Sequence, residues 1–344
     1  MDYIPVIDLK GVVDKCVEVE NGVLSIPKSD VPTWHRVAAE IRKALNGIGF
    51  MYLKNHGIGP EVISSAFGAS ETFFKLPVAT KSKYKKNPEI SSHGWVQPGQ
   101  ELLHPNSVFE LRECFDVAGN ERFYPTPDEH TNFGEVMEKL ENEGKRLMKK
   151  LLKLLGLSLE LEDTDYFIKC SRHLDSDRND PQNTITNECD LRAIYYPAIP
   201  NDLQVPTGTV RCAQHTDYEI LTLLFQDDVG GLEVNDVNGK WIPATPISNT
   251  ILVNTGDLLQ FWTNGYYPAT LHRVVIPEKE IGRKMGRYSF AYFFAPDDNT
   301  PIFPLRSNFI PISDTGRAAE EESERQPITA YQHIMERVKS AYQY

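Results

Sequence analysis

The chain has 344 residues, with 36 basic against 48 acidic side chains and a formal net charge of −12 at pH 7. Such a surface repels phosphate backbones, so we expect no nucleic-acid partner. The composition is 40% hydrophobic and 24% charged, and no apolar run approaches the roughly 18 residues that a membrane helix needs. The five cysteines form no CxxC pair, which argues against a zinc scaffold and favours a reducing, cytoplasmic compartment.

The first half of the chain has the pattern of helices separated by short strands. Apolar residues at helical spacing predict helices at about 33–46, 60–74 and 133–155. A buried strand is predicted at 50–53 and a shorter one at 114–117, within the otherwise irregular segment 78–130. Proline precedes the first helix and glycines follow it, as is typical of helix ends.

From residue 190 onward, short strands follow each other between turn residues. They are predicted at 192–196, 221–225, 231–234, 240–242, 251–254, 258–262, 272–276 and 288–294. Asn238-Gly239 and Asn264-Gly265 indicate two-residue hairpins. Closely spaced antiparallel strands favour a jelly roll, and a final helix is predicted at 329–342.

These elements predict a mixed α/β (α+β) fold with a jelly-roll core, flanking N-terminal helices and a C-terminal helix. We expect one domain over residues 1–344, because no linker separates the helices from the strands. Within it, 1–185 would form a helical and mixed region, 186–310 the catalytic jelly roll, and 311–344 a loop and helix.

His215-Thr216-Asp217 is the first motif that indicates chemistry. In a strand, residues i and i+2 point the same way, so an imidazole and a carboxylate would project together. That pair suits a borderline metal ion. His173 and Asp175 repeat the pattern in a polar stretch without an adjacent apolar strand, so we expect no metal there.

His272, in a later predicted strand, supplies a second imidazole. An antiparallel double sheet can return that strand beside the first. Two histidines and one aspartate then occupy one face of a metal ion and leave three positions open, as in non-haem Fe(II) oxygenases. The simpler interpretation of an isolated histidine is a buried side chain with a backbone partner.

Arg287 and Ser289 form a further same-face pair on a predicted strand. Arginine offers a planar fork for a carboxylate, and serine adds a hydroxyl donor. No acidic residue lies beside them in the sequence, so a dicarboxylic co-substrate would supply the anion. Tyr196 could reach the same anion, although a core tyrosine at a strand end fits its pattern equally well.

Together these motifs resemble the HxD…H…RxS pattern of the iron(II)- and 2-oxoglutarate-dependent dioxygenases of the isopenicillin N synthase-like family. Other stretches look like family landmarks: Pro5-Val6-Ile7-Asp8, residues 49–57, Phe73-Phe74-Lys75-Leu76-Pro77, residues 227–232 and Asn254-Thr255-Gly256-Asp257. The resemblance covers nearly the whole chain and implies a double-stranded β-helix.

The resemblance implies roles for individual residues. The catalytic metal ligands for Fe(II) would be His215, Asp217 and His272. The co-substrate 2-oxoglutarate would be held by Arg287, Ser289 and Tyr196. With O2, these would oxidise a small organic molecule and give succinate and CO2; hydroxylation is the default, and desaturation or ring closure are variants.

One departure from the family and several rival functions stay open. Many plant members have asparagine two positions before the tyrosine, where this chain has Ile194, so one contact to the co-substrate is expected to be missing. The Arg-x-Ser pair also occurs in same-fold iron oxidases that do not consume 2-oxoglutarate. Two further rivals are a catalytically silent small-molecule-binding relative and a cupin-like zinc hydrolase.

The substrate itself is not specified by any motif. We consider Trp95 and Phe109, in the irregular segment 93–115, and Phe294 as candidate substrate contacts, although apolar residues of this kind more often belong to a core. The expected partner is a small-molecule substrate, with no nucleic acid and no membrane. The expected state is a monomer or a weak homodimer.

Overall fold

The computed structural model describes residues 3–12, 17–18, 24–87, 92–101, 112–119, 122–174, 187, 189–198, 210–276, 285–311 and 328–341. Its helices are α1 (Val31–Gly47), α2 (Pro60–Phe74), α3 (Val78–Lys81), η2 (Ser82–Tyr84), α4 (Phe133–Ser158), α5 (Tyr166–Lys169), α6 (Asp257–Trp262) and α9 (Ala330–Ala341). None of the helices in this described part combines the length and the apolar character needed to cross a bilayer.

Two sheets form the centre of the molecule. The larger has the order β1 (Val6–Asp8), β4 (Phe50–Lys54), β12 (Thr250–Thr255), β9 (Leu221–Gln226), β14 (Arg287–Phe294), β7 (Asp190–Tyr196), β6 (Glu113–Val117) and β5 (Gly94–Val96). The smaller has the order β11 (Trp241–Pro243), β10 (Leu232–Asn235), β13 (His272–Val275) and β8 (Val210–His215). Two short pairs complete the strands: β2 (Val17–Glu18) with β3 (Leu24–Ser25), and β15 (Pro301–Ile302) with β16 (Ile328–Thr329).

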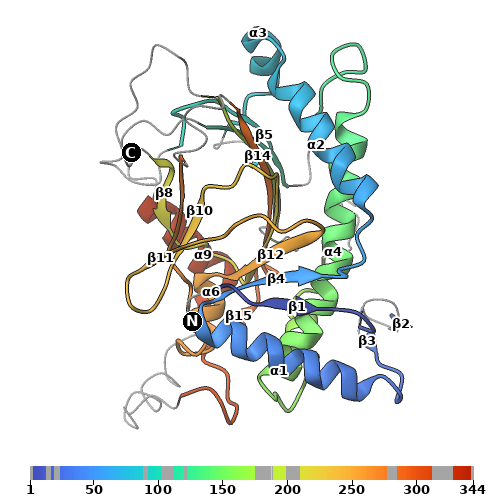
Figure 1. The fold of residues 1–344 in the computed structure, drawn as a ribbon, viewed down its shortest axis with the longest axis vertical. Helices are drawn as coiled ribbons and strands as arrows, with labels where there is room; N and C mark the ends of the chain where they lie inside the picture. Colours follow the sequence, from blue (N-terminus) through green and yellow to red (C-terminus); the bar gives the residue numbers. More distant parts are fainter. Residues whose placement is uncertain are drawn as a thin grey trace.

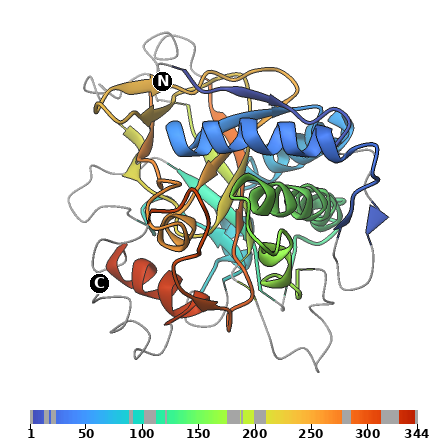
Figure 2. The same cartoon turned by 90° about the horizontal axis from the view of Figure 1, so that it is seen from below.

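The sheets and helices stack in layers (Figure 1). Helices α1, α2 and α4 cover one face of the large sheet, and the small sheet lies on its other side; the view from below shows α1 beside α4 (Figure 2). Except for the parallel pair β1 and β4, the large-sheet strands are antiparallel. The double-stranded β-helix with helices on one side confirms the fold class expected from the sequence.

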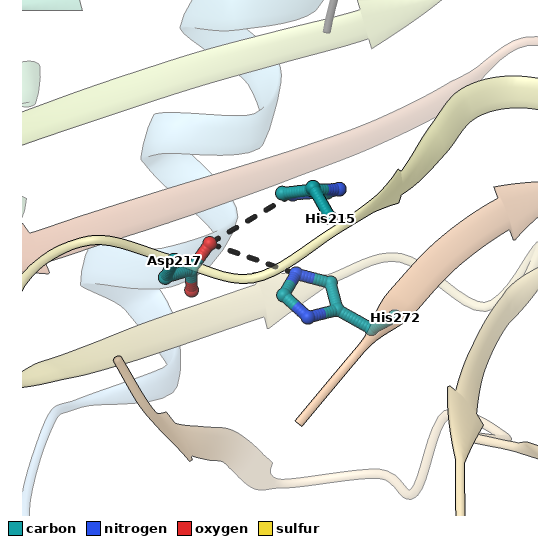
Figure 3. Close-up of side chains that lie close together, drawn as sticks. All are labelled: His215, Asp217 and His272. Atoms are coloured by element: carbon teal, nitrogen blue, oxygen red, sulfur yellow. Dashed lines mark ion pairs between the residues drawn. The ribbon is translucent and has the colours of Figure 1, made fainter. Parts of the chain in front are cut away.

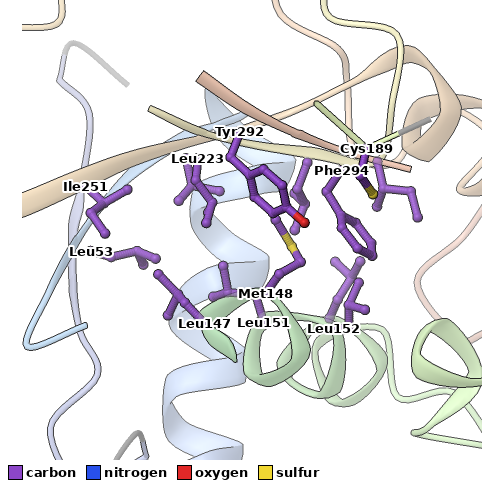
Figure 4. Close-up of a cluster of buried hydrophobic side chains, with 14 of the residues drawn as sticks. Leu53, Leu147, Met148, Leu151, Leu152, Cys189, Leu223, Ile251, Tyr292 and Phe294 are labelled. Carbon is purple, nitrogen blue, oxygen red and sulfur yellow. The ribbon is translucent and has the colours of Figure 1, made fainter. Parts of the chain in front are cut away.

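The period-two alternation of each strand divides the large sheet into an outer face and an inner face. Outer-face side chains such as Leu223, Tyr292 and Phe294 pack against Leu147 and Leu151 of α4 (Figure 4). Inner-face side chains form a second apolar cluster with the small sheet: Phe50, Tyr52, Ile194, Tyr196, Leu252 and Ala291 with Cys212, Leu232, Val234 and Val274. The space between the two sheets is therefore separate from the helix-covered core.

Gly49 shows how closely the N-terminal region packs on the jelly roll. Its φ is +71°, a left-handed conformation that favours glycine. A Cβ atom there would lie 2.4 Å from Thr270 Oγ1 and 2.9 Å from the Pro268 carbonyl oxygen. Only glycine therefore fits at the end of α1, just before β4 joins the large sheet.

The strand predicted at 258–262 is wrong, because these residues form the helix α6. Leu258, Leu259 and Trp262 are buried, a spacing that fits a helix turn, and a short apolar run does not distinguish the two structures. The hairpin predicted at Asn264-Gly265 is also wrong, because these residues end the helix α6 instead of joining two strands. Gly265 has a φ of +78° and donates its N–H to the Gln260 carbonyl at 2.8 Å, which closes the helix.

We expect the helix-covered core to account for a large share of the folding free energy. Leu151 on α4 is buried against the outer face, so Leu151→Ala should lower the free energy of unfolding by about 2–5 kcal/mol, measured in urea. Arg146 lies exposed on the same helix, and Arg146→Ala should change it by no more than about 0.5 kcal/mol. Equal losses for the two variants would contradict the packing described here.

Candidate metal and anion site

The structure brings His215, Asp217 and His272 together between the two sheets (Figure 3). His215 ends β8 and His272 begins β13, and the two residues are direct partners in the antiparallel ladder. Asp217 lies two residues beyond the end of β8, so the chain turn rather than strand alternation points its carboxylate at the histidines. One ligand atom of each lies within 4.8 Å of the others.

Backbone contacts determine which ring nitrogen each histidine presents. Nδ1 of His215 lies 2.8 Å from the Ala213 carbonyl oxygen, and Nδ1 of His272 lies 3.1 Å from that of Thr270. Because a carbonyl oxygen only accepts, each Nδ1 carries the proton and donates it. The Nε2 lone pairs then face Asp217 Oδ1, at 3.8 and 3.6 Å, as in protein metal sites where a backbone group orients the ligand.

Asp217 is oriented by side chains of the large sheet. Its Oδ2 accepts hydrogen bonds from Thr222 Oγ1 on β9 and, at 2.7 Å, from Asn254 Nδ2 on β12. Oδ1 is left facing the histidines. Burial tends to raise the pKa of Asp217, but at the low pH where this carboxyl group titrates the protonated His272 and His215, together with these two donors, hold that pKa below its usual value, so the carboxylate is ionised at neutral pH.

The donor set fits a divalent metal ion. Burial, with the nearby charge of His215, lowers the pKa of His272 to about 4, so this imidazole is neutral and its lone pair is available at neutral pH. Two neutral nitrogens and one anionic oxygen are ligands that iron, zinc and nickel accept. No other group of three His, Cys, Asp or Glu side chains with this proximity occurs among the described residues.

An anion site lies on the inner face of the large sheet. Arg287 pairs with Tyr196 across β14 and β7, and its guanidinium carbon lies 5.2 Å from the Tyr196 ring centroid. Nη1 of Arg287 donates to Ser289 Oγ at 3.1 Å, and Nη2 lies 3.5 Å from Gln226 Oε1. No motif in the sequence indicated that Gln226 belongs to this group.

Arg287 carries its charge inside the protein with no described carboxylate in ion-pairing range. It is only 1% exposed, and its Nε is buried without a hydrogen-bond partner. Burying such a cation is costly unless an anion and acceptors meet it. The guanidinium is therefore arranged to receive an anionic ligand from the space between the sheets.

Only some of the sequence-derived candidates lie in this space. Trp95 and Phe294 are buried in the outer-face core, and Trp95 donates to Glu113 Oε2 at 2.7 Å. Phe109 lies outside the described residues. Because Arg287 and Ser289 point inward, alternation along β14 also points Phe293 inward and Phe294 outward, a signal that the sequence contained.

The second His-x-Asp pattern is not part of the site. His173 Nδ1 lies 3.0 Å from Asp297 Oδ2, and Asp175 lies outside the described residues. No sequence motif indicated that Thr222 and Asn254 hold Asp217. Asn254 was noticed only as part of a landmark, and nothing in the sequence alone shows that it faces Asp217.

The chain matches two family models and several curated proteins. Residues 187–296 match the 2OG-Fe(II) oxygenase superfamily, and residues 4–135 match the non-haem dioxygenase in morphine synthesis N-terminal family. The chain is 34% identical over 313 residues to proline hydroxylase buaE of Petromyces alliaceus, covering 87% of this chain and 91% of that one. It is 28% identical to a homoarginine-6-hydroxylase of Glycine max, over 88% of each chain.

Solved structures agree in architecture. A full-length Neurospora crassa protein, crystallised in complex with alpha-KG and thymine, is 27% identical and superposes with a TM-score of 0.77, covering 98% of this chain and 97% of that one. A 2OG-Fe(II) oxygenase family protein from Caulobacter crescentus is 26% identical, with a TM-score of 0.71 and coverage of 90% and 95%. These likenesses extend over helices and sheets alike.

Removal of His272 should abolish tight metal binding. His272→Ala deletes one of three ligand atoms, so the affinity for Fe(II) should fall by more than the roughly 10–100-fold typical of losing an outer-shell partner. Anaerobic calorimetry with Fe(II) measures this. His173→Ala serves as the control because that ring contacts Asp297, and an equal loss in both variants would contradict the assignment.

Asn254→Ala tests the orientation of Asp217. Loss of the 2.7 Å donor leaves Thr222 alone to hold the carboxylate, and we expect an affinity for Fe(II) about 10–100-fold weaker. Circular dichroism should show an unchanged fold. An Asn254→Ala variant with native metal affinity would show that this hydrogen bond does not position the ligand.

Proposed function

The chain belongs to the 2OG-Fe(II) oxygenase superfamily, and we propose that His215, Asp217 and His272 hold its iron. It is an Fe(II)- and 2-oxoglutarate-dependent dioxygenase that oxidises a small organic molecule. Bound together, Fe(II), 2-oxoglutarate and O2 supply the oxidation of a substrate C–H bond, with succinate and CO2 as co-products. The observation that supports the residue assignment best is the convergence of His215, Asp217 and His272, the last two buried, in the same space between the sheets as the buried Arg287, which has no described carboxylate in ion-pairing range.

The three proposed ligands need little rearrangement to receive the metal ion. Their Nε2 and Oδ1 atoms already converge, and the Nδ1–H groups are engaged by carbonyl oxygens. The neighbouring histidines and the two hydrogen-bond donors hold the pKa of Asp217 below its usual value, so no proton has to leave it on binding at neutral pH. Preorganisation of this kind lowers the cost of forming the site.

Arg287, Ser289 and Tyr196 would hold the distal carboxylate of 2-oxoglutarate. The orphaned Nε of Arg287 and the Ser289 hydroxyl supply donors, and the guanidinium fork suits a carboxylate. Burial raises the pKa of Tyr196, so its phenol keeps the proton it would donate. Ser289 and Ala291 are small, which leaves little side-chain bulk on β14 between Arg287 and Phe293.

Apolar side chains around this region would exclude water. Phe50 places its ring edge-on to His272, with centroids 5.5 Å apart, and Ile194, Leu252 and Val234 belong to the same inner cluster. In a medium of low polarity, charge interactions are stronger than in water. Ile194 offers no polar atom, so the co-substrate would be oriented mainly through Arg287.

Hydroxylation is the proposed outcome, supported by relatives that are named for hydroxylating proline and homoarginine. Desaturation or ring closure would need a differently placed substrate. We also propose one catalytic domain, working in the cytoplasm without a nucleic-acid partner. The four described cysteines are free thiols, and the net charge of −12 opposes binding to nucleic acid.

Arg287→Leu tests the co-substrate site. Loss of a charged pairing at a desolvated site costs about 2–5 kcal/mol, so the KM for 2-oxoglutarate should rise about 30-fold to several thousand-fold. Arg287→Lys should recover only part of this loss because an ammonium cannot form the two-pronged contact. Succinate formation from 2-oxoglutarate in air with Fe(II) gives both values.

Iron affinity provides the internal control, since Arg287 is not a proposed ligand and both variants should bind Fe(II) as the native chain does. Substrate oxidation at full rate without 2-oxoglutarate would overturn this proposal. It would instead support a same-fold oxidase.

A further inference from the structure

The turn that carries Asp217 is attached to the start of helix α6. The backbone N–H of Asp257 donates to the Asp217 carbonyl oxygen at 2.8 Å, and that of Leu258 donates to the Tyr218 carbonyl oxygen at 3.1 Å. The first N–H groups of a helix have no acceptor within the helix, so the turn supplies the acceptors that α6 lacks. The main chain of Asp217 is therefore positioned by α6 as well as by the strands.

The side chain of Asp257 makes a second attachment to the same turn. Its carboxylate is 7% exposed, and burial raises its pKa, whereas the charge of Arg337 and a hydrogen bond from the Thr216 side chain act against that rise. Thr216 lies between two of the proposed ligands in the sequence. Asp257 thus contacts the ligand-bearing turn twice, through its backbone N–H and through its carboxylate.

Arg337, on the C-terminal helix α9, supplies the cation that meets this buried carboxylate. Its Nε lies 3.2 Å from Asp257 Oδ2. Helix α9 packs against α6 (Figure 1), where the rings of His333 and Phe261 have centroids 5.4 Å apart. The start of α9 is fixed separately, by the pairing of β15 with β16. The fold therefore holds Arg337 against Asp257.

The exposure of the two partners differs, and this difference decides where the ion pair acts. Arg337 is 50% exposed, and ion pairs that solvent reaches contribute little to overall stability. Asp257 is buried, and a buried carboxylate that loses its partner is unfavourable in its place. We expect it to shift toward water, and its backbone N–H would then displace the main chain of Asp217.

We propose that Arg337 is a positioning residue for the iron site: the C-terminal helix holds Asp257, and Asp257 holds the turn that presents Asp217. Asp217 is then supported in two ways. Thr222 and Asn254 orient its carboxylate, whereas α6 and α9 fix its main chain. This inference rests on the proposed function, because it concerns a ligand that the proposed function assigns.

The coupling between α9 and the metal must act in both directions. If docking of α9 strengthens iron binding, iron binding strengthens the docking of α9 by the same factor. Fe(II) added without O2 should therefore slow hydrogen exchange of the α9 amides more than it slows exchange of the α2 amides. An unspecific stabilisation of the fold would slow both helices alike.

Arg337→Gln in the full chain tests the inference, because glutamine keeps a polar side chain but removes the charge. The Kd for Fe(II), from anaerobic calorimetry, should rise about 3–10-fold, less than for an outer-shell partner in direct contact with a ligand. Arg337→Lys should restore most of the affinity, since an ammonium can still pair with Asp257. In Arg337→Gln the effect of Fe(II) on exchange in α9 should fall to that seen in α2.

Arg36→Gln is the matched control, because Arg36 pairs with Glu40 at similar exposure on α1 and should leave the Kd for Fe(II) unchanged. Urea unfolding of the metal-free chains separates positioning from stability. A merely structural ion pair would lower the free energy of unfolding in Arg337→Gln and leave the Kd of the folded chain as it is, which would overturn the inference.

Two further results would also contradict it. One is an equal loss of iron affinity in Arg36→Gln, and the other is exchange in native α9 that responds to Fe(II) no more than exchange in α2. The second measurement needs no variant, so it decides even where Arg337→Gln folds poorly. If His272→Ala loses iron and Arg337→Gln does not, only this inference fails, whereas native iron affinity in His272→Ala would overturn the proposed ligands as well.

Discussion

The antiparallel pairing of His215 with His272 is the constraint on which the rest of this site depends. It joins the end of β8 to the start of β13 and so brings together two imidazoles from distant parts of the sequence. The large sheet then positions the third proposed ligand, because Thr222 and Asn254 hold the Asp217 carboxylate against both rings. A displacement of either sheet would separate the ligand atoms, so the stability of the double sheet and the metal site are coupled.

The two faces of the large sheet carry different kinds of side chain. The outer face is apolar and packs on α4, where Tyr292 and Phe294 meet Leu147 and Leu151. The inner face carries Arg287 and Ser289 and a set of charged side chains that few protein cores contain. Strand alternation keeps these polar groups away from the helices, and the hydrophobic burial that stabilises the fold comes mainly from the outer side.

Charge is distributed unevenly over that inner face. The charges of four buried side chains compensate one another through short hydrogen bonds: Asp116, Glu101, Lys86 and Arg192. Their burial is tolerated because each group is paired. Arg287 lies outside this compensation, because no described carboxylate is in ion-pairing range of it and its buried Nε has no hydrogen-bond partner. Groups left unsatisfied next to a catalytic centre mark the positions that ligands complete.

The sequence by itself determined the class of fold and the identity of the candidate ligands and anion contacts, because strand alternation, turn residues and the His-x-Asp and Arg-x-Ser patterns are local. It could not separate a short apolar strand from the helix α6, since both bury the same residues. Only the tertiary structure decided that His272 lies beside His215 and that Thr222 and Asn254 hold Asp217. These relations depend on the register between strands far apart in the chain, which residue patterns within one strand do not encode.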